Sequence, residues 1–306
     1  AYAELKVPNS TWTVRTGIFG WGLPKYEGLV LFDDMGGINA FGTIGPVDLN
    51  LLYSRWNQGD RAKSDNRDIY AAQAGYRVNE QLDLTGMVTF LNDNRNDDNE
   101  YVVTGAGAEY AFGGNYRVRG FALYGNIDED NGLDGSSWMA DIALFAKHAK
   151  GQVKFHTGYF PDDAEARVFR SQGGYEYYSD NLSIMMTDAY YNNGSQGILA
   201  FDAAAYQGFG LVFATISGDY KLPQDSYLKY GLGYFTALDD DNGSVDVAGK
   251  SLGTEVALMA GKTFAEKYDL SLRGSYAVLG DFFDGFDAGS DPDDPWKVVA
   301  MLNISF

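Results

Sequence analysis

Residues 295–306, which read PWKVVAMLNISF, alternate between two kinds of side chain. Successive side chains of a β-strand point to opposite faces, so an alternation of this length predicts a strand. The second face is mixed and holds Lys297, Val299, Met301, Asn303 and Ser305. The first face is wholly apolar and must be covered by a protein core or by lipid; it consists of Trp296, Val298, Ala300, Leu302, Ile304 and Phe306.

The same period of two recurs along most of the chain, and convincing helical periodicity is absent. Glycine (38) and tyrosine (22) are abundant while proline (7) is scarce, which favours many strands joined by turns. The pattern predicts about sixteen strands, of which 36–44, 182–190 and 197–206 are the least regular. The predicted strands are 12–19, 36–44, 47–56, 69–78, 82–90, 101–112, 116–124, 138–147, 153–160, 182–190, 197–206, 211–220, 227–235, 252–262, 268–278 and 295–306.

Connections between these strands alternate between short and long. The short ones have the residues of tight turns: 45–46, 79–81, 113–115, 150–151, 192–195, 223–225 and 265–267. The long ones are polar: 57–66, 92–99, 127–137, 161–180, 238–250 and 281–295, with the short segment 207–210 as an exception. An antiparallel array with tight turns at one end and long loops at the other is therefore expected.

Charge is concentrated in the long loops. Segments 93–100, 128–134, 239–246 and 281–294 together carry -17 of the net charge of -19. An acidic chain repels nucleic-acid phosphates, so no nucleic-acid partner is expected. The chain has no cysteine, which excludes disulfides and thiolate metal sites. It also opens on AYAELKVPNS without the charged start and apolar core of a signal peptide, as expected of a mature, processed chain.

These features predict an all-β fold in which residues 1–306 form a single transmembrane antiparallel β-barrel. A strand of ten residues tilted by roughly 45° climbs about 23 Å, close to the apolar band of an outer membrane. A soluble β-sandwich or propeller is the rival, because its strands alternate too. Aromatic residues of the apolar phase lie mostly near strand ends, as interface girdles do: Trp12, Tyr53, Tyr76, Tyr110, Tyr116, Tyr124, Trp138, Tyr268, Trp296 and Phe306.

In its strand pattern, and most closely in its last strand, the chain resembles the Gram-negative outer-membrane porins, with no subfamily assigned. The resemblance implies short periplasmic turns, long acidic extracellular loops and passive diffusion of small hydrophilic solutes. It implies outer-membrane lipid, lipopolysaccharide and the barrel-assembly machinery as partners, and a homotrimer or a monomer stays open. In that family the terminal pattern is the signal that the assembly machinery reads, here Trp296, Leu302, Ile304 and Phe306.

If the apolar phase faces lipid, the other phase lines a lumen, and its charges require water there. Two interpretations of these charges stay open: a path that favours anions such as organic acids or phosphate, and cross-strand pairs that only stabilise a wet wall. The expected pore-lining bases, with one histidine, are Arg15, Arg77, Arg117, Arg119, Lys147, Lys154, His156, Lys229, Arg273 and Lys297; the expected acids are Asp48, Asp83, Glu109, Asp141, Glu255 and Asp269.

The longest loop, 161–180, is by resemblance the candidate for a constriction loop that folds inward. Arg167 and Arg170 would face Asp162, Asp163 and Glu165 across it; an ordinary external loop is the alternative. Segment 128–135, DEDNGLDG, has a spacing similar to that of calcium loops but lacks the later glutamate, so solvated acid is expected.

Two other classes of function compete with a channel. A hydrolase would have to use His148 or His156, and neither has a recognisable local motif. A sheath or surface anchor could hold a partner protein against small lining residues such as Ala71, Gly75, Gly158, Gly231 and Gly233. No cofactor is implied, because no nucleotide or metal motif is recognisable.

Overall fold

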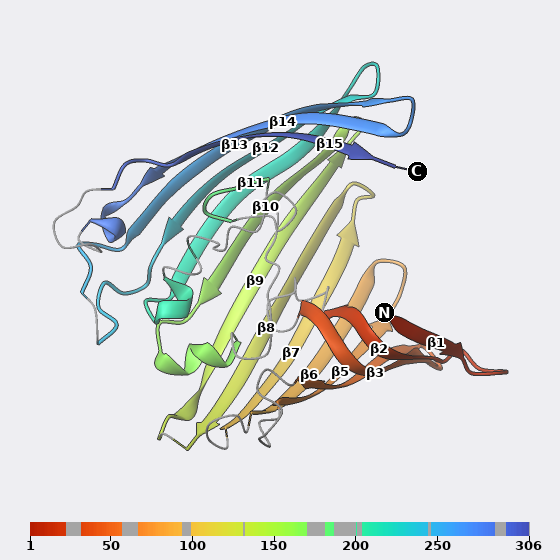
Figure 1. The fold of residues 1–306 in the computed structure, drawn as a ribbon. Helices are drawn as coiled ribbons and strands as arrows, with labels where there is room; N and C mark the ends of the chain where they lie inside the picture. The colour runs from red at the N-terminus through yellow and green to blue at the C-terminus, as the bar shows by residue number, and fades with distance from the viewer. Residues whose placement is uncertain are drawn as a thin grey trace. The chain divides into compact units, whose positions relative to one another are not determined.

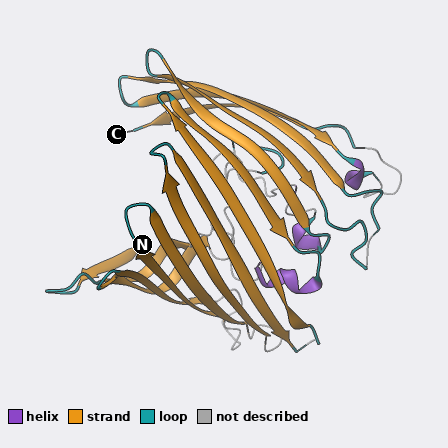
Figure 2. Ribbon diagram, turned by 180° about the vertical axis from the view of Figure 1, so that it is seen from behind, coloured by secondary structure: helices purple, strands orange, loops and turns teal. Residues whose placement is uncertain are grey.

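The structure is a computed structural model. It describes residues 1–22, 32–56, 67–93, 99–130, 132–169, 181–186, 200, 204–243, 246–284 and 292–305. Within these ranges the chain forms fifteen strands and three short 3-10 helices (Figures 1 and 2). The strands are β1 (Tyr2–Lys6), β2 (Thr13–Gly22), β3 (Phe32–Ile44), β4 (Val47–Trp56), β5 (Arg67–Arg77), β6 (Leu82–Asp93), β7 (Asn99–Phe112), β8 (Tyr116–Glu129), β9 (Asp134–His148), β10 (Gly151–Phe160), β11 (Leu211–Leu222), β12 (Ser226–Thr236), β13 (Ser251–Phe264), β14 (Tyr268–Leu279) and β15 (Trp296–Ile304). The helices are η2 (Ala164–Phe169), η4 (Ala205–Gln207) and η5 (Asp281–Phe283).

All fifteen strands belong to one sheet and follow one another in chain order from β1 to β15 (Figure 1). The registers are antiparallel, for example from Tyr227↔Gly261 to Leu232↔Val256 between β12 and β13. This arrangement confirms the predicted all-β antiparallel fold. β1 and β15 stand at the two ends of the order, so closure into a barrel stays a prediction.

Fourteen of the sixteen predicted strands are confirmed, and β1 was missed. The predictions for 182–190 and 197–206 are wrong over their described residues, which form bends at 181–186 and part of η4. The predicted long loop at 127–137 is also wrong, because β8 continues to Glu129 and β9 begins at Asp134. The predicted tight turn at 192–195 lies outside the described residues.

The other six predicted tight turns join strands as expected. Asn79 fixes the turn between β5 and β6, since its Oδ1 accepts the backbone N–H groups of Gln81 (2.8 Å) and Leu82 (2.9 Å). The turn between β11 and β12 places Gln224 and Asp225 at φ of 60° and 56°, the left-handed conformation that hairpin turns need. These six turns therefore lie at one end of the strands, whereas the short β8–β9 connection lies at the other.

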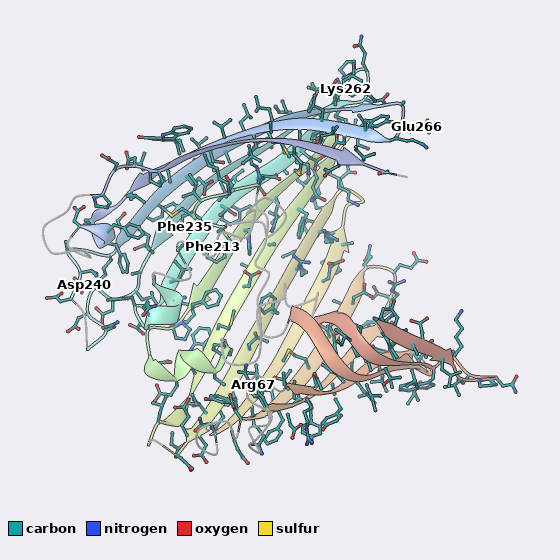
Figure 3. All side chains as sticks on the ribbon, viewed as in Figure 1. Arg67, Phe213, Phe235, Asp240, Lys262 and Glu266 are labelled. Carbon is teal, nitrogen blue, oxygen red and sulfur yellow. The ribbon has the colours of Figure 1, made fainter. Side chains whose placement is uncertain are left out.

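The chain divides into two compact units. Unit 1 comprises Ala1–Tyr110, Arg119–Ala140 and Ala164–Glu176; unit 2 comprises Ala111–Val118, Asp141–Asp163 and Tyr177–Phe306. Figure 3 shows the two ends of the unit 2 strands, with Glu266 in a tight turn and Asp240 in an acidic loop at the opposite end. The single domain expected over residues 1–306 stays a prediction.

In both units one face of the sheet is largely apolar and exposed, and the other is buried and carries polar and charged side chains among apolar ones such as Leu123 and Phe213. We call the exposed side the outer face and the buried side the inner face. On β6 of unit 1, Val88 is 42% exposed while Thr89 is fully buried. On β14 of unit 2 the inner residues Ser271, Arg273, Ser275 and Ala277 are 0–6% exposed, and the outer residues Leu270, Leu272, Tyr276 and Val278 are 44–56% exposed.

An exposed apolar face sets this sheet apart from a soluble β-sandwich or propeller, in which the apolar face fills the core and the polar face meets water. A large exposed apolar face is stable only against another apolar phase. The terminal strand follows the same rule, with Trp296 73% and Leu302 55% exposed. Within the described residues, no helix has the length and apolar character needed to span a membrane. The outer face therefore fits lipid contact, as the alternation of residues 295–306 predicts.

Candidate functional site

Residues 181–186, which we call the strap, cross the inner face of β11–β14 in unit 2. At its start the side-chain amide Nδ2 of Asn181 donates to two backbone carbonyls, Gly218 of β11 (3.1 Å) and Tyr230 of β12 (3.2 Å). Leu182 follows and is fully buried. A Cβ added to Gly233 of β12 would lie 2.7 Å from Leu182 Cδ1, so Leu182 lies directly over this glycine.

The centre of the strap is bound by one carboxylate, that of Glu255 on β13. Its Oε1 accepts the N–H of Ser183 (2.6 Å), its Oε2 accepts the N–H of Met185 (2.7 Å), and both oxygens lie 3.1 Å from the N of Ile184. The Ser183 hydroxyl is also hydrogen-bonded to the Ser275 hydroxyl of β14. Bonds to an ionised acceptor are about twice as strong as neutral ones.

These bonds explain why the predicted strand at 182–190 does not form over its described residues. Leu182, Ile184 and Met186 alternate with Ser183 and Met185, as in a strand. Successive N–H groups of a strand point in opposite directions, whereas those of residues 183–185 converge on one carboxylate. The hydrogen bonds to Glu255 therefore determine the conformation of residues 183–185.

Two cations lie beside Glu255 on the inner face. Lys297 of β15 is the register partner of Ser275, and Arg273 is two residues from Ser275 on the same face of β14. Arg273 is 2% exposed. Both cations interact electrostatically with Glu255. The sequence placed all three residues in the lumen phase, and the structure brings them together under the strap.

A second buried pair on the inner face joins β9 and β10. His156 Nε2 and Asp141 Oδ2 lie 2.6 Å apart in a hydrogen bond, and both side chains are at most 1% exposed. The His156 ring also meets the Phe213 ring edge-on at 4.9 Å (Phe213 is labelled in Figure 3). This pair fits the cross-strand interpretation of the inner charges.

Other inner-face charges of unit 2 lie against aromatic rings. The guanidinium of Arg117 lies 4.1 Å from the centroid of Phe145, and Lys154 Nζ lies 5.9 Å from the same ring. Near the tight turns, Lys229 Nζ lies 5.8 Å from the Tyr227 ring, whose hydroxyl donates to Asp269 (2.9 Å). Lys147 is exposed near the end of β9.

In unit 1 several predicted lining residues form cross-strand pairs. Arg77 and Asp83 are 3.0 Å apart beside the β5–β6 turn, and Arg15 and Glu4 are 3.0 Å apart between β2 and β1. Other predicted lining residues of unit 1 lie around two pockets. One pocket is lined by Asp83, Glu109 and Arg119, and the other by Asp48, Arg77 and Asp83. Bases and acids therefore alternate closely on this part of the inner face.

The first part of the predicted constriction loop forms η2. Its Val168 and Phe169 are buried, and Val168 packs directly on Gly125 of β8, where an added Cβ would clash with it. Glu165 lies against Gly135 of β9, while Asp162 is exposed. The side chain of Arg167 and all of Arg170 lie outside the described residues, so their predicted facing of Asp162, Asp163 and Glu165 stays a prediction. The sequence did not indicate the strap that follows.

The predicted histidine at the end of β9 and the predicted assembly signal in β15 are both at exposed positions over their described residues. His148 is exposed at the end of β9, where its Nδ1 accepts the N–H of Lys150 (3.3 Å). Trp296, Leu302 and Ile304 lie on the outer face, and Phe306 is outside the described residues. In the part of the chain that the structure describes, no three His, Asp or Glu side chains cluster so that they could hold a metal ion.

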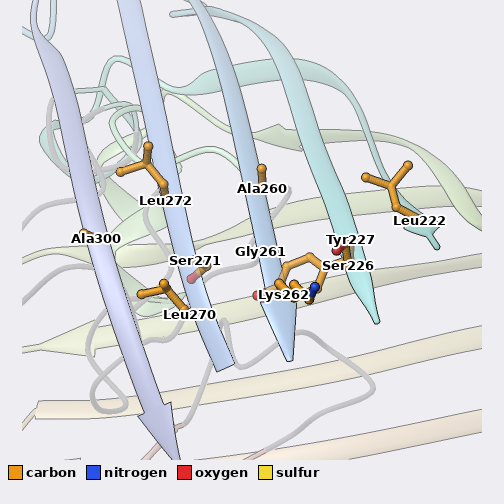
Figure 4. A pocket seen from close by; sticks show the side chains of 10 residues that line it. All are labelled: Leu222, Ser226, Tyr227, Ala260, Gly261, Lys262, Leu270, Ser271, Leu272 and Ala300. Atoms are coloured by element: carbon orange, nitrogen blue, oxygen red, sulfur yellow. The ribbon is translucent and has the colours of Figure 1, made fainter. Parts of the chain in front are cut away.

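The outer face of unit 2 carries a groove of about 500 Å³ near the tight turns (Figure 4). Leu222, Leu270 and Leu272 project around it, with Lys262 beside them. Its apolar lining separates it from the polar inner face, so it does not belong to a path for hydrophilic solutes.

Comparison with known proteins adds the class of the fold. No protein-family model and no curated protein matches the sequence. Among solved structures, OccK3 (OpdO) of Pseudomonas aeruginosa is similar with a TM-score of 0.61 and 16% identity over 99% of this chain and 78% of that one. OpdL of the same organism has a TM-score of 0.55 and 14% identity over 92% of this chain and 76% of that one.

A third similar structure is Wzi of Escherichia coli, an outer-membrane protein involved in group 1 capsule assembly and described as a carbohydrate-binding β-barrel. Its TM-score is 0.59, with 14% identity over 100% of this chain and 70% of that one. At these identities the likeness establishes the fold. The chain has the fold of the Gram-negative outer-membrane porin-like β-barrels, with no subfamily assigned.

Proposed function

We propose that the protein lies in the outer membrane and acts as a passive diffusion channel for small hydrophilic solutes. The observation that carries this proposal is the inverted sheet, with apolar residues such as Leu272 exposed and ionisable residues such as Glu255 and Arg273 buried on the opposite face. Charges on an inner face need water or partners. A wet inner face within a lipid-facing wall is the requirement for a channel.

We further propose that the path favours anions such as organic acids or phosphate. Two inner-face acids of unit 2 are already engaged: Asp141 by His156, and Glu255 by the N–H groups of the strap. Bases also line this face, among them Lys154, Lys229 and Lys297. Partners that fit the proposal are outer-membrane lipid, lipopolysaccharide and the barrel-assembly machinery.

Planar-bilayer recording of the pure protein tests the proposal. We expect stable conductance steps, and a salt gradient should give a reversal potential on the anion side. Replacing Arg117, Arg119 and Arg273 with glutamine should shift that potential toward cations, whereas a matched triple change of Lys150, Lys221 and Lys267 to glutamine, at exposed positions by the tight turns, controls for net charge. Absence of conductance above the detergent background would contradict the channel. An unchanged potential in the triple variant would contradict the anion path alone.

A second candidate is a structural barrel, either a sheath or a surface anchor for a partner. The similarity to Wzi over the full length of this chain favours it. Pull-down with capsular polysaccharide, or purification with a stoichiometric second protein, would support this candidate in place of the channel. A catalytic role is disfavoured, since His156 is fully buried against Asp141 and Phe213.

A further inference from the structure

One side chain of the wall accepts all three central N–H groups of the strap. Three successive N–H groups, those of residues 183–185, reach the carboxylate of Glu255 at N···O distances of 2.6–3.1 Å. Glu255 is 1% exposed, and β13 is paired with β12 on one side and β14 on the other. A carboxylate on a doubly paired strand is a rigid anchor. We infer that Glu255 is a positioning residue that fixes the strap across the inner face and so sets the cross-section open to solutes.

Small neighbours of Glu255 let the strap lie directly on the wall. The register partners of Glu255 are Gly233 on β12 and Ala277 on β14. Leu182 lies over Gly233, where an added Cβ would be 2.7 Å from its Cδ1. The small lining residues that suggested room for a guest polypeptide include Gly233, which accommodates a segment of the chain itself.

The same contacts change the electrostatics of the inner face. The N–H groups of the strap supply partial positive charge to Glu255, as a backbone nest does for an anion. Arg273 and Lys297 also interact with the carboxylate electrostatically. Loss of Glu255 would therefore leave the central N–H groups of the strap without their acceptor and would remove a negative charge beside two cations. Both effects would alter the path of a charged solute.

The position of the strap can be measured without any channel activity. The natural chain has no cysteine, and the hydroxyls of Ser183 and Ser275 are hydrogen-bonded, so Ser183→Cys with Ser275→Cys should form a disulfide on mild oxidation. Adding Glu255→Gln, which keeps the size of the side chain and removes its charge, should slow this cross-linking at least about tenfold, equivalent to about 1.4 kcal/mol. Glu266→Gln, the same change in an exposed turn, should leave the rate as it was.

A folding defect is separated from strap release by chemical rescue. Glu255→Ala leaves the N–H groups of the strap without their carboxylate, and added sodium formate offers a carboxylate small enough to replace it. We expect formate to restore cross-linking in this variant and sodium chloride at equal ionic strength to have no such effect. Equal cross-linking rates in the Glu255→Gln and Glu266→Gln backgrounds, or no rescue by formate, would overturn the anchoring role.

The effect on solutes rests on the proposed function and has a separate readout. In planar bilayers Glu255→Gln should give larger or more variable conductance steps than Glu266→Gln. Closing the 183–275 disulfide in the Glu255→Gln background should remove that difference. If cross-linking responds as expected but the conductance does not, Glu255 does not set the cross-section. If no variant conducts, the channel proposal fails while the anchoring result stands.

Discussion

Replacing Leu272 with arginine tests the lipid-facing assignment of the outer face quantitatively. Leu272 projects from β14 (Tyr268–Leu279) and is 56% exposed. With a rise of about 3.3 Å per residue and a tilt of roughly 45°, it lies about 9 Å above Tyr268, close to the middle of an apolar band about 25 Å tall. Arginine near the bilayer midplane of a barrel destabilises it by about 2–4 kcal/mol, and near the interface by only about 0–1 kcal/mol. Leu272→Arg should therefore be costly, and Tyr268→Arg should be nearly neutral.

The assay is urea unfolding and refolding of both variants in phospholipid vesicles, with the free energy of unfolding taken from the transition. Replacing an exposed leucine on a water-soluble protein changes the free energy of unfolding by no more than about 0.5 kcal/mol in either direction. A loss of that size for Leu272→Arg, or equal losses at both positions, would refute the reasoning. Lipid contact at the outer face requires a larger loss of unfolding free energy for Leu272→Arg, near the middle of the apolar band, than for Tyr268→Arg near its edge.

The buried pair and an acidic loop give two further predictions. Asp141→Ala leaves His156 buried without its carboxylate and should lower the free energy of unfolding by about 3–5 kcal/mol. Asp68→Ala removes the partner of the half-exposed Arg55 and should lower it by about 0–1 kcal/mol. Equal losses in urea unfolding would contradict the burial of the Asp141–His156 pair. The next residue's backbone N–H, and then Lys250, lower the pKa of the Asp239 carboxyl in the β12–β13 loop. Its contribution to stability is thus present above its unfolded pKa and lost as pH falls through the lower folded pKa. Lys250→Gln should raise this pKa in an NMR titration; no change would exclude the ion pair as a cause.

Most of the fold could be predicted from the sequence because strands whose two faces meet different surroundings keep strict alternation. The period of two therefore survives along β14 and β15, whose apolar residues are exposed on one face. β1 was missed because its five residues, YAELK, are too short to display a period. The error at 182–190 has a different cause. Its side chains alternate as in a strand, but the N–H groups of residues 183–185 bind Glu255 and not a neighbouring strand.

The lining residues and the strap differ in how far the sequence determines them. Phase alone places Arg273, Glu255 and Lys297 on the inner face, because alternation is a local property of each strand. The contact between Ser183 and Glu255 joins residues 72 positions apart, and no local motif indicates it. A glutamate between Gly233 and Ala277 on neighbouring strands is a trace of the strap in the wall, and it is visible only once the register is known.

A nitroxide scan along β14 shows whether the apolar face of the sheet lies in lipid or in water. The absence of native cysteine means that each single-cysteine variant carries one label. In reconstituted vesicles, labels at positions 270, 272, 276 and 278 should collide with dissolved oxygen far more than with a water-soluble nickel complex, and labels at 269 and 273 should not show this preference. Preferential collision of the first group with the nickel complex would contradict the account, because the apolar face would then lie in water.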